Sequence, residues 1–137
     1  MGRRRKAREL ALQSLYEMEF PGKDAGEVLR DQADRRGSNV ESQDYATRLV
    51  SWVDAERAAL DEAIDAQLQN WDPERVSLVL RNLLRLGLAE ARHAPEVPRA
   101  VILDEWVELA RKFDTEEGLR FVNGVLDKLL EKERPSA

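Results

Sequence analysis

The sequence contains no cysteine, a single histidine and few of the residues that make turns. Without cysteine, disulfides and thiolate metal sites are impossible, and a cytoplasmic location is the simplest interpretation. His93 could form a zinc site only together with several carboxylates, so we expect no metal site. The 7 Gly, 5 Pro and 6% aromatic residues are too few for an all-β fold. No run of about 18 apolar residues occurs, so we expect no membrane-spanning segment.

What the sequence does contain favours one helical domain. Its 137 residues are 42% hydrophobic and 36% charged, enough for a buried core under a charged surface. Helix-forming residues dominate, and apolar residues recur with helical spacing. We therefore predict an all-α fold in a single domain, residues 1–137.

The predicted helices follow from this spacing and from their start and stop signals. In WDPERV, Asp72 would cap a helix whose first position is Pro73, where the missing N–H is harmless. That boundary divides the chain into helical halves of about 1–70 and 71–137, and the tail ERPSA is expected to fray. The predicted helices are 3–20, 24–35, 44–69 with a bend near Asp54, one starting at Asp72, one after Pro98 and one after Thr115.

The charge of the first eight residues differs from that of the rest. Five of these eight are basic and none is acidic, whereas the whole chain has 22 basic and 27 acidic residues and a net charge of -5. The remainder therefore has 17 basic and 27 acidic residues. Clustered cations at a helix N-terminus oppose the helix dipole, so we expect them to serve something other than helix stability.

On a helical wheel, Leu12 and Tyr16 lie away from the buried stripe of the first helix, on the same side as Arg5 and Arg8. A basic surface next to an aromatic ring suits single-stranded RNA, because guanidinium groups neutralise phosphates and a ring stacks on a base. The alternative is that Leu12 and Tyr16 pack against a neighbouring helix and that the arginines form a solvated helix end.

The last helix shows a similar outlier in LRFVNGVLDK. Phe121 points away from the apolar stripe on the wheel, and Gly124 lies in mid-helix, where it costs about 1 kcal/mol relative to alanine. Either tight helix packing or a binding partner would explain this glycine. Three arginines follow the outer side of the fourth predicted helix, where we interpret them as a solvated face and, alternatively, as a partner surface: Arg81, Arg85 and Arg92.

The search for catalytic groups finds no candidate. His93 lies near a helix end and is better explained as a surface or capping residue than as a general base. The chain has no Gly-rich phosphate loop and no nucleophile elbow, and its acidic pairs are consecutive on helices and so diverge. We predict that the protein is not an enzyme.

Four segments resemble the NusB family of bacterial transcription antitermination proteins in order and spacing: RRRKARELALQSLYEME, LRNLLRLGLAE, PRAVILDEWVELARKF and RFVNGVLDKL. The resemblance implies six or seven helices in two small bundles. It also implies binding to the boxA element of ribosomal RNA leaders jointly with NusE, a ribosomal small-subunit protein. Other Nus factors and RNA polymerase would complete the assembly, and the resemblance implies no cofactor.

The resemblance also implies which residues contact RNA. The helical wheel places one of them, Phe113, inward, so for this residue the two predictions conflict unless the ring is partly buried and presents an edge. The RNA-binding residues implied by position are Arg3, Arg4, Arg5, Lys6, Arg8 and Tyr16 in the first cluster, and Arg111, Lys112, Phe113, Arg120 and Phe121 in the second.

Two other functions fit parts of the sequence. One is a homodimeric interaction module in which exposed Leu12, Tyr16 and Phe121 meet their copies and mask the RNA surface. The other is the N-terminal part of a ribosomal RNA cytosine methyltransferase, which we rank lower because 137 residues leave no room for a cofactor-binding α/β domain.

Overall fold

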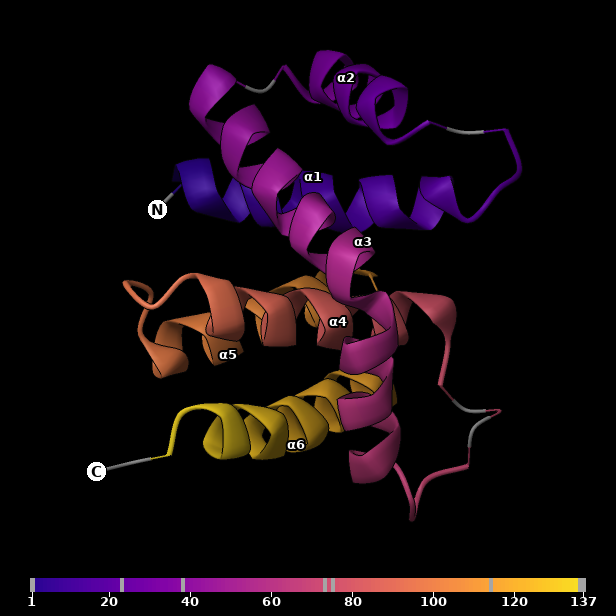
Figure 1. Cartoon of the computed structure of the whole chain (residues 1–137), viewed down its shortest axis with the longest axis vertical. Coiled ribbons are helices and arrows are strands. Elements are labelled where there is room, and N and C mark those ends of the chain that lie inside the picture. Colours follow the sequence, from indigo (N-terminus) through magenta and orange to yellow (C-terminus); the bar gives the residue numbers. More distant parts are fainter. Residues whose placement is uncertain are drawn as a thin grey trace. The chain divides into compact units, whose positions relative to one another are not determined.

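A computed structural model describes residues 2–22, 24–37, 39–72, 74, 76–113 and 115–135, without the side chains of Arg3 and Arg36. Within these residues all regular secondary structure is α-helical apart from a single 3₁₀ position, and no strand occurs, which confirms the all-α prediction. Figure 1 shows the helices, whose bounds are α1 Gly2–Met18, α2 Ala25–Arg36, α3 Val40–Gln67, α4 Leu78–His93, α5 Arg99–Phe113 and α6 Glu116–Glu133.

The chain divides into two compact units, Met1–Ser51 and Trp52–Ala137. The division therefore falls inside α3, about twenty residues before the boundary near residue 70 that the sequence suggested. Residues 52–67 of α3 belong to the second unit because their side chains bind α4. Asp61 accepts hydrogen bonds from Arg85 at 2.7 and 2.9 Å, and Asp65 pairs with Arg81 at 2.9 Å.

In the first unit, α1 and α2 pack as an antiparallel pair (Figure 1). The predicted helix over 24–35 is confirmed, with Asp24 as its cap: the carboxylate accepts a hydrogen bond from the Glu27 amide at 3.2 Å. Gly37 ends α2 in the left-handed conformation, φ 63°, which glycine adopts without a steric penalty. The core of this unit is formed by Ala7, Leu10, Ala11, Leu15, Val28, Ala33, Ala46, Leu49 and Val50.

The bend predicted near Asp54 is confirmed at Glu56, which has non-helical backbone angles of φ -117° and ψ 21°. The Glu56 carboxylate is hydrogen-bonded to His93 and lies 3.9 Å from Arg92. The His93 ring also stacks on Trp52, with centroids 5.2 Å apart and planes 16° apart. The only histidine is therefore part of the contact between α3 and the end of α4.

The interpretation of Arg81, Arg85 and Arg92 as a solvated face is wrong. Arg85 is 7% exposed, and all three arginines form ion pairs with carboxylates of α3 or α6. The wheel placed them on the outer side of α4 because it shows one helix at a time. In the folded unit, that side faces the second half of α3 and, at Arg92, the end of α6.

The predicted start of the fourth helix at Asp72 is also wrong. The Asp72 carboxylate accepts a hydrogen bond from the Glu74 amide at 3.0 Å, but α4 begins only at Leu78. Ser77 is its cap and accepts from the Leu80 amide at 3.1 Å. The chain contains two capping residues five positions apart, and the second begins the helix. Pro73 lies outside the described residues.

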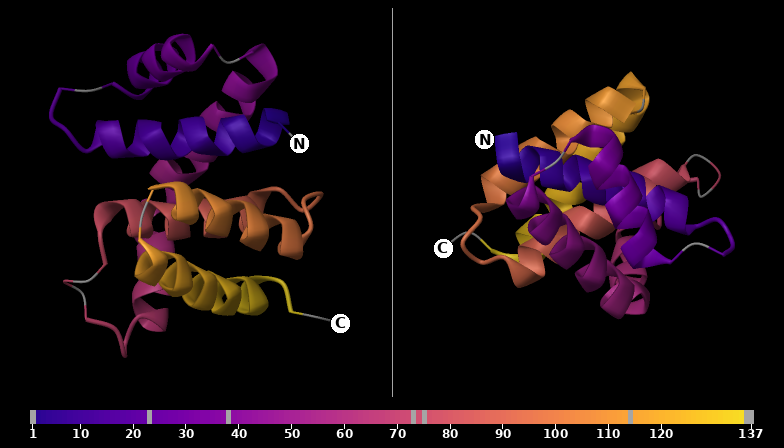
Figure 2. Two further views of the ribbon diagram at one scale, coloured as in Figure 1. Left: turned by 180° about the vertical axis from the view of Figure 1, so that it is seen from behind. Right: turned by 90° about the horizontal axis from the view of Figure 1, so that it is seen from above.

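In the second unit, α4, α5 and α6 pack against one another, and α5 and α6 run antiparallel (Figure 2). Trp106 is fully buried, and its indole N–H donates to the Glu90 carboxylate at 2.8 Å. The predicted fraying does not apply to Arg134, since its guanidinium donates to the carbonyl of Ala91 near the end of α4 and to those of Ala94 and Val97 in the α4–α5 connection. Among the described residues, no helix is long and apolar enough to cross a membrane.

Candidate nucleic-acid interface

The first turns of α1 present three basic side chains to solvent. Arg4, Arg5 and Lys6 are exposed, while the Arg3 side chain lies outside the described residues. Arg4 lies over the ring of Tyr45 on α3, with Cζ 4.4 Å from the ring centroid. Contact at this distance is a cation–π interaction, which holds the guanidinium without neutralising its charge. We call Arg4, Arg5 and Lys6 the α1 patch.

Two residues expected at this surface are buried instead. Arg8 is 2% exposed and Leu12 is 3% exposed, so neither presents its side chain to solvent. The wheel counted only one buried stripe on α1. The helix packs against α2 and also contacts α3 through Arg4 and Tyr45, so more than one side of it is covered.

Tyr16 is 43% exposed, as predicted, near the end of α1. Its ring meets that of Phe20 edge to face, with centroids 5.7 Å apart, and Phe20 is 51% exposed. Phe20 was not predicted as a site residue, and it is the last residue of the first helix predicted from the sequence. Two exposed rings in contact form a larger apolar platform than Tyr16 alone.

The second predicted cluster lies on both sides of the connection between α5 and α6. Arg111 and Lys112 are exposed, and Arg111 pairs with Glu108 at 3.4 Å. Phe113 is half-buried, and the Lys112 amine lies 5.5 Å from its ring centroid. The ring of Phe113 is therefore neither fully inward nor fully exposed, and its contact with RNA stays a prediction.

On α6, Arg120 is exposed but Phe121 is not. Phe121 is 5% exposed and packs edge to face against Trp71, with ring centroids 4.8 Å apart. The wheel placed Phe121 away from the apolar stripe, which is correct for α6 alone. The loop before α4 supplies Trp71 to cover it, so the prediction that Phe121 faces solvent is wrong.

Trp71 and Phe121 border a pocket of about 510 Å³. Trp71 is 44% exposed, so part of its indole remains accessible. Trp71 was not predicted as a site residue, although a tryptophan between Asn70 and Asp72 in a polar loop indicates a candidate binding surface. An aromatic wall with hydroxyl, amide and carboxylate groups around it suits a flat polar ring. The other lining residues are Asn70, Asp72, Ser77, Leu80, Thr115, Glu117 and Gly118.

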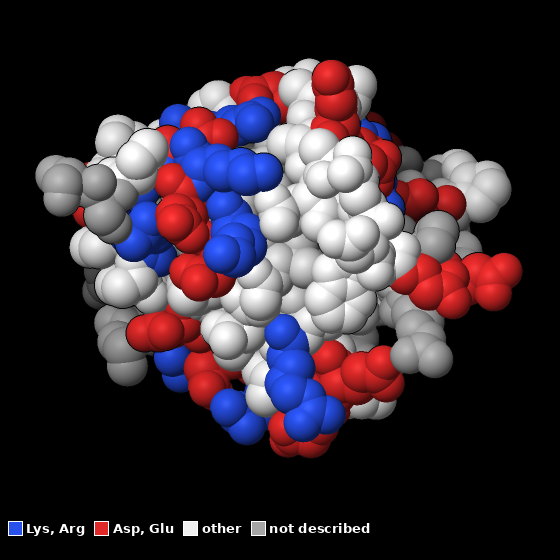
Figure 3. Space-filling model, turned by 90° about the horizontal axis from the view of Figure 1, so that it is seen from below, with Lys and Arg blue, Asp and Glu red and all other residues white. Residues whose placement is uncertain are grey.

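The basic side chains of the α1 patch stand out against the charge of the chain. The sequence of the first unit has 10 basic and 9 acidic residues, and that of the second has 12 and 18. Figure 3 shows both signs of charge side by side on one face of the molecule, next to a broad uncharged area. Within the described residues, no cluster of three or more His, Asp or Glu side chains could hold a metal ion.

Two of the three residues on which a homodimer was predicted, Leu12 and Phe121, are buried, and only Tyr16 remains exposed.

The α1 patch and Tyr16 belong to the first unit, and the cluster at the α5–α6 connection belongs to the second. These features define a class: an all-helical protein whose exposed Arg and Lys side chains lie close in sequence to accessible aromatic rings. A model of the NusB family matches residues 5–131. The chain belongs to the NusB family.

Relatives and solved structures agree with this assignment over nearly the whole chain. A transcription antitermination protein NusB from Sorangium cellulosum is 47% identical over 131 residues, which cover 96% of this chain and 94% of the relative. A structure of T. maritima NusB has a TM-score of 0.86 at 29% identity, covering 96% of this chain and 93% of that one. A structure of NusB and NusE in complex with double-stranded RNA has a TM-score of 0.85 at 28% identity, covering 96% and 98%.

Proposed function

We propose that this protein is a non-enzymatic transcription antitermination factor that binds boxA RNA of ribosomal RNA leaders together with NusE. The observation that carries the proposal is the α1 patch, three exposed cations in successive positions of a chain that is otherwise acidic. The family supports it, since a solved structure similar to this chain is a complex of NusB, NusE and RNA. Other Nus factors and RNA polymerase would join the assembly in the cytoplasm.

In this proposal the α1 patch holds phosphates. Arg4, Arg5 and Lys6, with Arg3 beside them in sequence, neutralise the RNA backbone without reading its bases. Arg8 has a different role, because a side chain that is 2% exposed cannot reach a phosphate unless it moves. Tyr16, with Phe20 against it, offers the stacking surface of the first unit.

The second unit supplies the remaining contacts. Arg111, Lys112 and Arg120 are exposed and would bind phosphates, and half-buried Phe113 would present a ring edge. Phe121 acts through Trp71, whose accessible face would stack on a base at the pocket. Stacking of one base on an aromatic ring contributes about 1 to 3 kcal/mol.

A binding titration at two salt concentrations tests the proposal. If about four phosphates are neutralised, log K falls with log salt at a slope of about -3 for single-stranded RNA. We expect boxA RNA to bind more tightly than a scrambled oligonucleotide of equal length, and more tightly still when NusE is present. Equal affinity for the two RNAs, with and without NusE, would contradict the proposal.

A further inference from the structure

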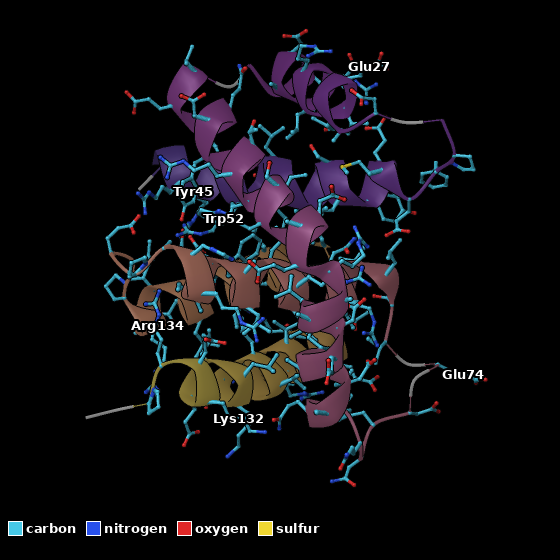
Figure 4. All side chains as sticks on the ribbon, viewed as in Figure 1. Glu27, Tyr45, Trp52, Glu74, Lys132 and Arg134 are labelled. Carbon is cyan, nitrogen blue, oxygen red and sulfur yellow. The ribbon has the colours of Figure 1, made fainter. Side chains whose placement is uncertain are left out.

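Besides the pocket beside Trp71 in the second unit, the structure has a pocket in the first unit that was not predicted from the sequence. It has a volume of about 330 Å³ and is lined by Arg4, Glu41, Asp44, Tyr45 and Arg48. Four of these residues follow one another on α3 at spacings of three, one and three, so they lie on one face of that helix. Figure 4 shows Tyr45 beside the start of α1, from which Arg4 comes.

Tyr45 lines this pocket with a buried ring. Its side chain is 6% exposed, with Arg4 Cζ 4.4 Å and Arg48 Cζ 6.0 Å from the ring centroid. A buried ring has few rotamers to choose from, so it fixes the position of a guanidinium that lies on it. The two arginines belong to different helices and converge on one ring.

The pocket carries both signs of charge, because Glu41 and Asp44 share it with the two arginines. Two carboxylates make a poor site for a phosphate alone, since they repel it. They suit a ligand that has a hydroxyl donor close to its anion. In single-stranded RNA, each ribose 2′-hydroxyl can donate a hydrogen bond to a carboxylate, and it adjoins a phosphate that arginine binds well.

We propose that this pocket binds one ribose-phosphate unit of RNA. Arg4 and Arg48 bind the phosphate, Glu41 or Asp44 accepts a hydrogen bond from the 2′-hydroxyl, and Tyr45 is a positioning residue for Arg4. The inference rests on the proposed function, since it extends the α1 patch onto α3. It adds that the chain prefers RNA to DNA of the same sequence.

The test titrates the full chain with boxA RNA and with single-stranded DNA of the same sequence. Arg48→Gln should weaken RNA binding several-fold and reduce the steepness of the salt slope by about 0.7, the contribution of one phosphate. Arg30→Gln removes an exposed arginine of α2 outside the pocket and should change the affinity far less. The double variant Glu41→Gln, Asp44→Asn should bring the RNA and DNA affinities closer together.

Tyr45 is tested by two variants. Tyr45→Phe keeps the ring and should bind RNA as the native chain does, whereas Tyr45→Leu should lose affinity and reduce the salt slope. Circular dichroism shows whether Tyr45→Leu is folded. If it is not folded, the RNA affinity of Arg48→Gln tests the pocket instead.

The outcomes separate the two claims. A native chain that binds no RNA overturns the proposed function and this inference together. The pocket inference alone is overturned if the native chain binds RNA, Arg48→Gln and Arg30→Gln have equal RNA affinities, and the double variant leaves the preference for RNA over DNA unchanged.

Discussion

At the scale of single residues, arginines of this chain have two different environments. Arg85 is 7% exposed and donates hydrogen bonds to Asp61 and Asn82, so its charge is used inside the fold. Arg4 is exposed, and its guanidinium lies over the buried ring of Tyr45. The residue type is the same, and the partner determines whether it stabilises the fold or can bind a ligand.

The pairing of Asp61 makes stability depend on pH. Burial alone would raise the pKa of this carboxyl, but hydrogen bonds and charge from Arg85, with Arg81 and Arg57, outweigh burial and hold the pKa below its ordinary value of 3.8. A carboxyl with a lowered folded-state pKa stabilises the fold above its unfolded pKa. That stability is lost as the pH falls through the folded pKa.

We therefore expect Asp61→Asn to lower the free energy of unfolding by about 2 kcal/mol at pH 7, because it leaves the Arg85 charge buried without its carboxylate. The difference from the native chain should shrink below about pH 4. Asp65→Asn is the control, since the Asp65 side chain is 62% exposed and an exposed pair contributes about 0 to 1 kcal/mol. Urea unfolding at several pH values measures the stability of both variants. Equal losses of unfolding free energy at pH 7 would contradict the account.

At the scale of helices, local signals predicted some ends and not others. Asp24 and Gly37 mark α2 because each acts through backbone groups within four residues of itself. Thr115 likewise caps α6 by accepting from the Gly118 amide at 3.1 Å. The start of α4 was mispredicted because Asp72 and Ser77 are both good capping residues. Sequence alone does not say which one the packing of the following helix selects.

Two mid-helix glycines, Gly87 and Gly124, have opposite environments. We therefore expect alanine substitutions at the two positions to have opposite effects on stability. A Cβ at Gly124 on α6 would meet nothing within 4 Å, so tight packing within the chain does not explain this residue. A Cβ at Gly87 on α4 would lie 2.9 Å from a methyl of Leu126, which is fully buried.

Gly124→Ala should therefore raise the free energy of unfolding by about 0.5 to 1 kcal/mol through helix propensity. Gly87→Ala should lower it by about 1 kcal/mol, because the clash outweighs the same gain in propensity. Thermal unfolding of the two variants measures whether each substitution raises or lowers the free energy of unfolding. If Gly124→Ala were destabilising instead, an unrecognised packing role for Gly124 would be indicated.

At the scale of the whole molecule, the fold class and family were predictable from sequence, whereas the surfaces were only partly so. Helical spacing identifies six helices because it depends on neighbours along the chain. The burial of Arg8, Arg85 and Phe121 depends on side chains from other helices or loops, which a wheel cannot show. For the same reason Trp71 and Tyr45 were not among the site residues predicted from the sequence.

The chain offers an internal comparison for the proposed RNA site, because its three tryptophans differ in environment. Trp71 is 44% exposed beside the pocket, whereas Trp106 is fully buried and bound to Glu90. Trp52 is half-buried and stacks on His93. A ligand that stacks at the pocket should affect one indole and leave the buried one unchanged.

Nuclear magnetic resonance of the isotopically labelled chain with boxA RNA tests the central claim most directly. We predict that RNA shifts the indole N–H signal of Trp71 and the backbone amides of residues 4–6, while the indole signal of Trp106 stays in place. Tight binding of the RNA with no change at Trp71 and none at residues 4–6 would contradict the account.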